Sequence, residues 1–175
     1  VLGGLLKHTA EVATIARAIS RASGADGDLV LAGVLLHDIG KLGSYRWDTH
    51  FEMTEAGHLL GHVVLGALML DRVVGEADPS PCTEDELLIL QHLVLSHHGR
   101  LEYGAPVPPM TLEAEVLHYA DNASAKSASM AEAIGTAEHF AEGEQVSSRR
   151  IWSLDNRKVF RGRSEWGAGE VRSET

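Results

Sequence analysis

Apolar residues recur at helical spacing through almost the whole of this chain, and this pattern constrains its fold more than any other feature. No stretch of the first 140 residues alternates between apolar and polar side chains as a half-buried strand would. The pattern therefore predicts an all-α protein. With 175 residues, 44% apolar and 23% charged, the chain can bury a core and is neither disordered nor collagen-like.

Five core helices are expected. Asp28 is the expected N-cap of the second helix, Gly40 its expected end, and Thr83 forms a capping-box pattern with Glu86 ahead of the fourth. Thr111 is the expected cap of the fifth. The expected helices lie at about 5–20, 29–36, 54–74 and 84–97 and from Thr111 onward, with a polar, aromatic connection at 42–53 and a loop at 99–109.

The chain is predicted to divide into a helical domain at 1–142 and a C-terminal extension at 143–175. The extension contains Trp152, Phe160 and Trp166 among basic residues and glycines. This composition is more typical of a peripheral flap, with Trp152 and Phe160 packed over the helices, than of a second core. The flap could instead grip single-stranded nucleic acid by stacking and charge.

Charge and cysteine content limit the function classes. The net charge is −10, and the first 145 residues hold 8 basic and 21 acidic groups, which gives 8 − 21 = −13 for that part. A protein segment this acidic binds phosphate backbones poorly by itself, but its carboxylates favour the binding of cations. A single cysteine, Cys82, excludes a disulfide framework, and no uncharged apolar run approaches the roughly 18 residues of a membrane span. We therefore expect a cytoplasmic protein with no membrane partner and, because it begins at Val1, one excised from a longer chain.

Histidines and aspartates on separate helices form a candidate metal site. A lone histidine on an apolar helix face is more often a satisfied core residue than a ligand, but burying several unpaired imidazoles would be costly, so a metal explains them together. Imidazole and carboxylate suit manganese, iron, cobalt or zinc, whereas magnesium usually recruits oxygen ligands. The seven candidate ligands are more than one ion needs, so two divalent ions are expected, with Asp38 as the bridging ligand between them. The candidate ligands are His8, His37, Asp38, His62, His97, His98 and Asp121.

The order of these residues along the chain, and the short motifs around them, resemble those of the HD-domain superfamily of metal-dependent phosphohydrolases. The chain is most similar to the catalytic domain of YhaM-type 3′-to-5′ exoribonucleases. The similarity covers about residues 3–130 and implies an HD-domain helical bundle. The motifs that carry it are GGLLKHT at 3–9, LLHDIGK at 35–41, LGH at 60–62, LSHHG at 95–99 with LEYG at 101–104, and HYADN at 118–122.

The resemblance implies a division of the ligands between two metals. One metal would take His8, His37, Asp38 and Asp121, and the second Asp38, His62, His97 and His98. Two cations would bind phosphodiester oxygens and acidify a shared water, and the expected nucleophile is a metal-bridging hydroxide. Manganese is the preferred ion. Lys41 is expected to neutralise a phosphate oxygen in catalysis, and Arg100 and Lys126 are candidate substrate-binding residues.

Several alternatives stay open. His58 could serve as a further ligand, and Lys41 could merely cap a helix. The expected substrate is single-stranded RNA, with DNA second, but a mononucleotide, a deoxynucleoside triphosphate or a cyclic nucleotide would use the same chemistry. A non-catalytic regulatory module with a structural metal and a di-iron oxygenase are further readings. YhaM-type enzymes usually carry an oligonucleotide-binding barrel before this domain, so such an upstream domain would lie outside this chain, and homo-oligomerisation is also left open.

Overall fold

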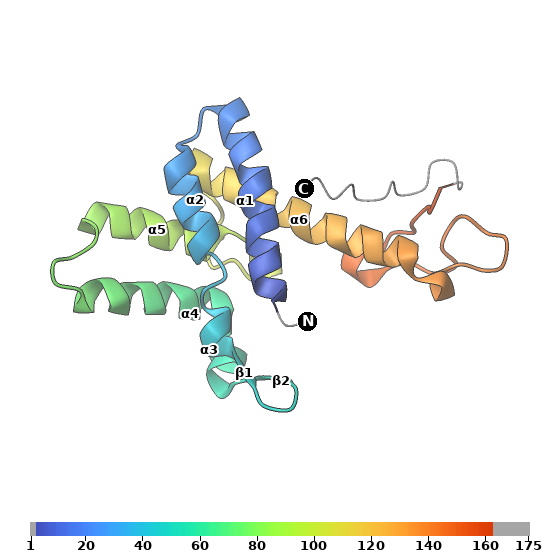
Figure 1. Cartoon of the computed structure of the whole chain (residues 1–175), viewed down its shortest axis with the longest axis horizontal. Helices are drawn as coiled ribbons and strands as arrows, with labels where there is room; N and C mark the ends of the chain where they lie inside the picture. The colour runs from blue at the N-terminus through green and yellow to red at the C-terminus, as the bar shows by residue number, and fades with distance from the viewer. Residues whose placement is uncertain (1–2, 163–175) are drawn as a thin grey trace. The chain divides into compact units, whose positions relative to one another are not determined.

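The computed structural model describes residues 3–162, which divide into two compact units, the first ending at Ala123 and the second beginning at Ser124. The all-α prediction is confirmed: five helices have ten or more residues. In chain order the first unit contains α1 (Gly4–Ser23), α2 (Gly27–Leu36), α3 (Lys41–Ser44), β1 (Tyr45–Trp47), β2 (Phe51–Met53), α4 (Glu55–Glu76), α5 (Glu84–Ser96), the 3-10 turn η1 (Leu101–Tyr103) and the start of α6 (Leu112–Gly135) (Figure 1).

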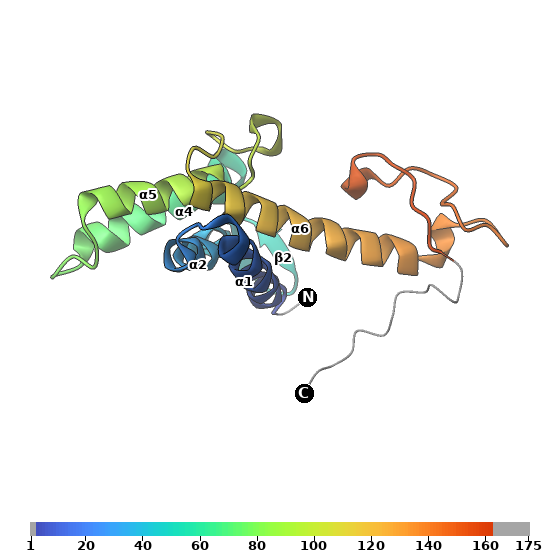
Figure 2. The same ribbon diagram turned by 90° about the horizontal axis from the view of Figure 1, so that it is seen from above.

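Four helices build the core of the first unit. Helix α2 is apolar on all sides because it packs between α1 and α5. Figure 1 and the view from above in Figure 2 show α1 beside α2 and α4 beside α5. The buried core side chains are Val12 and Ala16 of α1, Val30 and Val34 of α2, Leu93 of α5, and Ala114, Val116, Leu117 and Ala120 of α6.

The helix starts follow from capping residues, with one correction. Thr83 and Glu86 form the predicted capping box of α5, and the Thr111 hydroxyl accepts the backbone N–H of Ala114 at 3.1 Å, as predicted. The prediction of Asp28 as a cap is wrong. Asp26 caps α2, because its extended backbone lets the carboxylate accept the N–H groups of Asp28 and Leu29, while Asp28 already lies in the first helical turn.

The segment between α2 and α4 contains secondary structure that the sequence did not predict. Helix α2 ends at Leu36, before Gly40, which instead precedes the short helix α3. The expected connection at 42–53 contains an antiparallel hairpin, in which Tyr45 pairs with Met53 and Trp47 with Phe51. Three residues per strand are too few to raise a period-two signal in the sequence.

The second unit has its own small core. The later turns of α6 supply Met130 and Ala133, which pack with Phe140, Ile151, Leu154 and Val159. These contacts hold the second unit together, and the division into a helical domain at 1–142 and an extension at 143–175 stays a prediction. The prediction that Trp152 and Phe160 are packed is wrong, since they are 85% and 54% exposed, and Trp166 lies outside the described residues.

Within the described residues, α4 is the one helix long and apolar enough to cross a membrane by length and composition. It also packs against α3 and α5 and carries His62, one of the candidate ligands. These contacts join α4 to the other elements of the first unit.

Candidate metal centre

The structure brings all seven predicted ligands together in the first unit. Neighbouring imidazole rings lie 4.4 to 5.8 Å apart between centroids, from His8 through His37 and His97 to His62 and His98. The two carboxylates join the same cluster through Nε2 atoms of these rings. Residues far apart in the sequence therefore converge on one site.

Helix ends fix the orientation of three of the histidines. His37 and His97 are the C-cap residues of α2 and α5. The Nδ1 atom of each lies 2.7 Å from a carbonyl three residues back, Val34 O and Val94 O, and carbonyls in a last helical turn lack an intrahelical partner. His98 Nδ1 likewise lies 2.7 Å from Tyr103 O. A carbonyl can only accept, so Nδ1 must carry the proton, and Nε2 is left as the free donor atom for a metal.

Glycines place His62. Gly61, just before it, has φ 70° and ψ 160°, a conformation that interrupts α4 and that residues with a Cβ rarely adopt. Gly40 touches the His62 backbone so closely that a Cβ there would lie 1.9 Å from the His62 carbonyl oxygen. Gly66 and Gly57 also meet α3 or its flanks at close range. Gly57 and Gly66 are thus positions of close packing, whereas nothing lies within 4 Å of a Cβ at Gly61.

The first ligand group consists of His8, His37 and Asp121, whose donor atoms all lie within 4.8 Å of one another. Asp121 Oδ1 is 3.0 Å from His8 Nε2 and 4.0 Å from His37 Nε2. Two ligands bound at about 2.1 Å to the same ion lie about 3 to 4 Å apart. The group therefore has the spacing that one ion requires.

The second ligand group consists of His62, His97 and His98, again within 4.8 Å of one another. Asp38 lies between the two groups. Its Oδ2 is 3.4 Å from His37 Nε2 and 3.9 Å from His8 Nε2, whereas its Oδ1 is 3.3 Å from His62 Nε2 and 3.9 Å from His97 Nε2. One carboxylate thus presents a different oxygen to each group, as a bridging ligand does.

Buried donor atoms without partners favour a metal at this site. Nε2 of His37, His62 and His97 is buried and makes no hydrogen bond of acceptable geometry. Orphaned buried nitrogens cost roughly 1 to 3 kcal/mol each, so a protein rarely keeps several in one place unless something else binds them. A mixed imidazole and carboxylate set suits borderline divalent ions. The residues present therefore fit one or two such ions.

The charges prepare the ligands for binding. Burial alone would raise the pKa of Asp38, but the neighbouring His37 and His62 imidazoles and the Lys41 ammonium outweigh it and hold that pKa below its ordinary value. The pKa of Asp121 is also lowered: burial would raise it, but the contact with His8 and the nearby histidine charges outweigh burial. Burial lowers the pKa of His97 to about 3, helped by repulsion from the other histidines. At neutral pH both carboxylates are ionised and His97 is neutral, the forms that bind metals.

The pKa of His37 shifts in the opposite direction from that of His97. Burial would lower its pKa, but the nearby negative charges of Asp38 and Asp121 outweigh burial and raise it. The raised pKa favours a proton on His37 beside the charge of Asp38. An ion would displace this proton when it binds.

The predicted catalytic and substrate-binding cations occupy different places. Lys41, the first residue of α3, contacts Asp38 Oδ2 at 2.5 Å and so belongs to the cluster. Arg100 is exposed and its guanidinium lies 6.0 Å from the Tyr103 ring centroid. Lys126 belongs to the second unit, where its ammonium contacts Asp155 at 2.8 Å and donates to Ser153 O. His58 is outside both ligand groups.

Two supporting residues were not assigned to the site from the sequence. His118 Nδ1 lies 2.9 Å from the carbonyl of the ligand His97. Gly99, with φ 77°, lets the chain pass so close to His118 that a Cβ would lie 2.2 Å from the ring. The glycine directly after a His-His pair was the available sequence signal.

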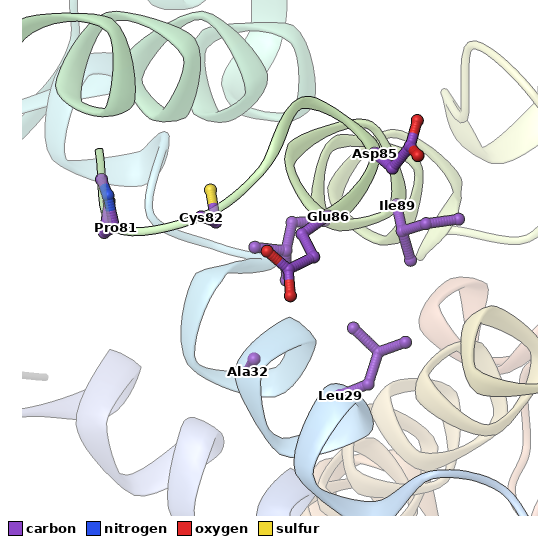
Figure 3. A pocket seen from close by; sticks show the side chains of 8 residues that line it. Leu29, Ala32, Pro81, Cys82, Asp85, Glu86 and Ile89 are labelled. Carbon is purple, nitrogen blue, oxygen red and sulfur yellow. The ribbon is translucent and has the colours of Figure 1, made fainter. Parts of the chain in front are cut away.

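A separate cavity of about 400 Å³ lies between α2 and the start of α5 (Figure 3). Its lining is mostly apolar and includes Cys82 but no histidine. Glu86 at its edge is already engaged by Thr83. The cavity shares no residue with the metal cluster.

Comparison with known proteins agrees with this geometry. A family model described as the HD domain matches residues 5–126, a range that contains every candidate ligand from His8 to Asp121. The match implies metal-dependent phosphohydrolase activity, and the two ligand groups could hold the metal. No solved structure matches the chain.

Proposed function

The chain belongs to the HD-domain family, and on that premise we propose that it is a divalent-metal-dependent phosphodiesterase that removes nucleotides from the 3′ end of single-stranded RNA, with DNA as a second substrate. We take manganese as the ion, which suits the mixed imidazole and carboxylate donors, as iron, cobalt and zinc also do. An oligonucleotide-binding domain upstream of this chain would add affinity for long substrates.

One observation carries the proposal. Asp38 offers Oδ2 to the group of His8, His37 and Asp121 and Oδ1 to the group of His62, His97 and His98. A bridged pair of sites is the arrangement that two-ion phosphoester hydrolysis needs, because both ions must touch the same phosphate. A single structural metal would not need ligands on both sides of one carboxylate.

The chain's own residues have separable tasks in this reaction. Two divalent ions, when bound, would neutralise the anionic phosphodiester and lower the pKa of the attacking water. The carbonyls of Val34, Val94 and Tyr103 hold histidine rings in the orientation that aims Nε2 at the centre. Lys41, whose side chain is more exposed than that of Asp38, places a positive charge beside this carboxylate, where it could bind a non-bridging phosphate oxygen.

The choice of RNA rests on the motifs of the sequence, which resemble YhaM-type 3′-to-5′ exoribonucleases. A second candidate is a small nucleotide substrate, such as a deoxynucleoside triphosphate or a cyclic nucleotide. It is favoured by the charge of −13 over the first 145 residues, from 8 basic and 21 acidic groups, since such a body repels a long polyanion. The two candidates share the reaction and differ in substrate length.

A digestion assay tests the proposal. Single-stranded RNA labelled at its 5′ end is incubated with Mn²⁺ and wild type, Asp38→Asn or Asp28→Asn, and the products are resolved as a ladder. Asp28→Asn is the matched control, because it makes the same change at the opposite end of α2. We expect a ladder from wild type and Asp28→Asn and none from Asp38→Asn.

Other patterns would redirect or refute the proposal. Hydrolysis of cyclic nucleotides or deoxynucleoside triphosphates without an RNA ladder would select the second candidate. A ladder that survives Asp38→Asn would refute the role of the bridging carboxylate. Bound manganese with no hydrolysis of any of these substrates would favour a regulatory module.

A further inference from the structure

The hairpin of β1 and β2 has one apolar and one charged face. The register pairs Tyr45 with Met53 and Trp47 with Phe51, and residues two apart in a strand share a face, so these four side chains lie on one side. The opposite face carries Arg46 and Glu52, joined by an ion pair of 2.6 Å. The pairing therefore builds an aromatic surface.

This aromatic surface is open. Trp47 and Phe51 are 57% and 55% exposed and pack edge to face, with ring centroids 4.8 Å apart at 61°. They line a cavity of about 530 Å³, within the range of small-molecule pockets. Its lining is Leu5, Lys41, Leu42, Tyr45, Trp47 and Phe51.

Two residues link this cavity to the metal centre. Lys41 lines the cavity and contacts the bridging carboxylate of Asp38. Leu5 lies three residues before the ligand His8 in α1, on the same helix face. The cavity therefore adjoins the ligand cluster at Lys41.

We propose that this cavity binds the base of the nucleotide whose phosphate lies at the metal centre, an inference that rests on the proposed function. A nucleotide has an anionic group and a flat aromatic group joined by a sugar. The site places the metal-ligand cluster and Lys41 beside the exposed rings of Trp47 and Phe51, which matches both ends of that ligand.

The lining also indicates how selective the cavity is. Its polar side-chain groups are the Lys41 ammonium, the Tyr45 hydroxyl and the Trp47 indole N–H, too few to read the donor and acceptor pattern of a base. Every base has a face that can stack, so binding through the rings tolerates sequence. The cavity separates ligands with a base from ligands without one and discriminates weakly among bases.

Calorimetric titration with two matched ligands tests the inference. In Mn²⁺, adenosine 5′-monophosphate carries a base and ribose 5-phosphate lacks one, and chromatography confirms that both stay intact. Wild type should bind the nucleotide more tightly by about 5-fold to about 100-fold, the range expected for stacking of one base. Trp47→Ala and Phe51→Ala should each reduce this ratio, the double variant should bring it close to one, and Trp47→Phe, which keeps a ring, should restore most of it.

The control acts on the other face of the same hairpin. The double change Arg46→Gln with Glu52→Gln removes the ion pair without altering net charge and should leave the ratio as in wild type. Equal affinity of wild type for the two ligands, failure of both to bind, or a ratio that survives the loss of both rings would overturn the inference. Failure of the proposed function is distinguishable, because then the RNA ladder is absent while the preference for the nucleotide persists.

Discussion

Gly40→Ala tests how the contact between α3 and α4 supports the metal centre. Gly40 has φ −63° and ψ −16°, which alanine adopts readily, so the substitution costs nothing in backbone conformation. A Cβ there would lie 1.9 Å from His62 O and 2.5 Å from Gly66 N. Both are backbone atoms of α4, which no rotamer change can move aside.

The size of the effect follows from that distance. Opening the contact from 1.9 Å to the 3.4 Å of ordinary van der Waals contact moves His62 relative to Asp38 by up to 1.5 Å. Metal sites tolerate ligand shifts of about 0.2 Å. Overpacking costs typically about 1 to 3 kcal/mol, and we expect about 3 kcal/mol of lost folding free energy because the clash involves backbone alone. The second ligand group should then bind metal much more weakly.

Two measurements separate these effects. Urea unfolding in EDTA gives the stability without metal, and calorimetric titration with Mn²⁺ gives the affinity. Gly75→Ala in the last turns of α4 is the matched control, because nothing lies within 4 Å of its Cβ, and it should stabilise by about 0.5 to 1 kcal/mol. A Gly40→Ala protein as stable as wild type in EDTA, with unchanged Mn²⁺ affinity, would refute the reasoning.

Further predictions concern the bridge, the lysine and one helix cap. Asp38→Asn should retain less manganese than wild type after dialysis, measured by mass spectrometry of the metal content, because both ligand groups lose their shared oxygen donor. Lys41→Ala should lower turnover more than metal content, and loss of the metal instead would contradict its assigned role. Thr83→Ala should cost about 1 kcal/mol in urea unfolding without changing metal affinity, because it removes the cap of α5. Hydrogen bonds from Thr83 lower the pKa of Glu86 from its ordinary 4.5, so Glu86 stabilises the fold fully above that pH and less as pH falls further. Glu86→Gln should therefore differ from wild type more at pH 7 than at pH 3.

The helices were predictable from sequence because capping and periodicity are local. Thr83 and Thr111 cap the helices that follow them, as their spacing indicated. The cap of α2 was misplaced because two aspartates flank Gly27 and the sequence does not say which one has an extended backbone. The hairpin was missed since its alternation spans three residues per strand, below the length at which strands can be recognised.

The identity of the ligands was predictable, and their geometry was not. A His-Asp pair and a His-His pair on separate helices indicated a metal site through residue type alone. Which oxygen of Asp38 faces which group depends on the crossing of helices distant in sequence. The interruption of α4 at Gly61 depends in turn on a positive φ that a glycine permits without requiring it.

The centre departs from the rules that hold elsewhere in the chain, and this departure is itself an argument for its use. Apart from it, the core cluster of the first unit is aliphatic, and side-chain caps satisfy the starts of α2, α4 and α5. At the centre, His37 and His97 use the free carbonyls of two helix ends to aim Nε2 inward, where it finds no hydrogen-bond partner. A fold that orients these buried nitrogens and leaves them without hydrogen bonds has a metal-binding site that is organised before any cation binds. Since the ligands come from α1, α4 and α6 and from the residues just after α2 and α5, an ion bound there would also hold these helices together, so binding and stability are linked.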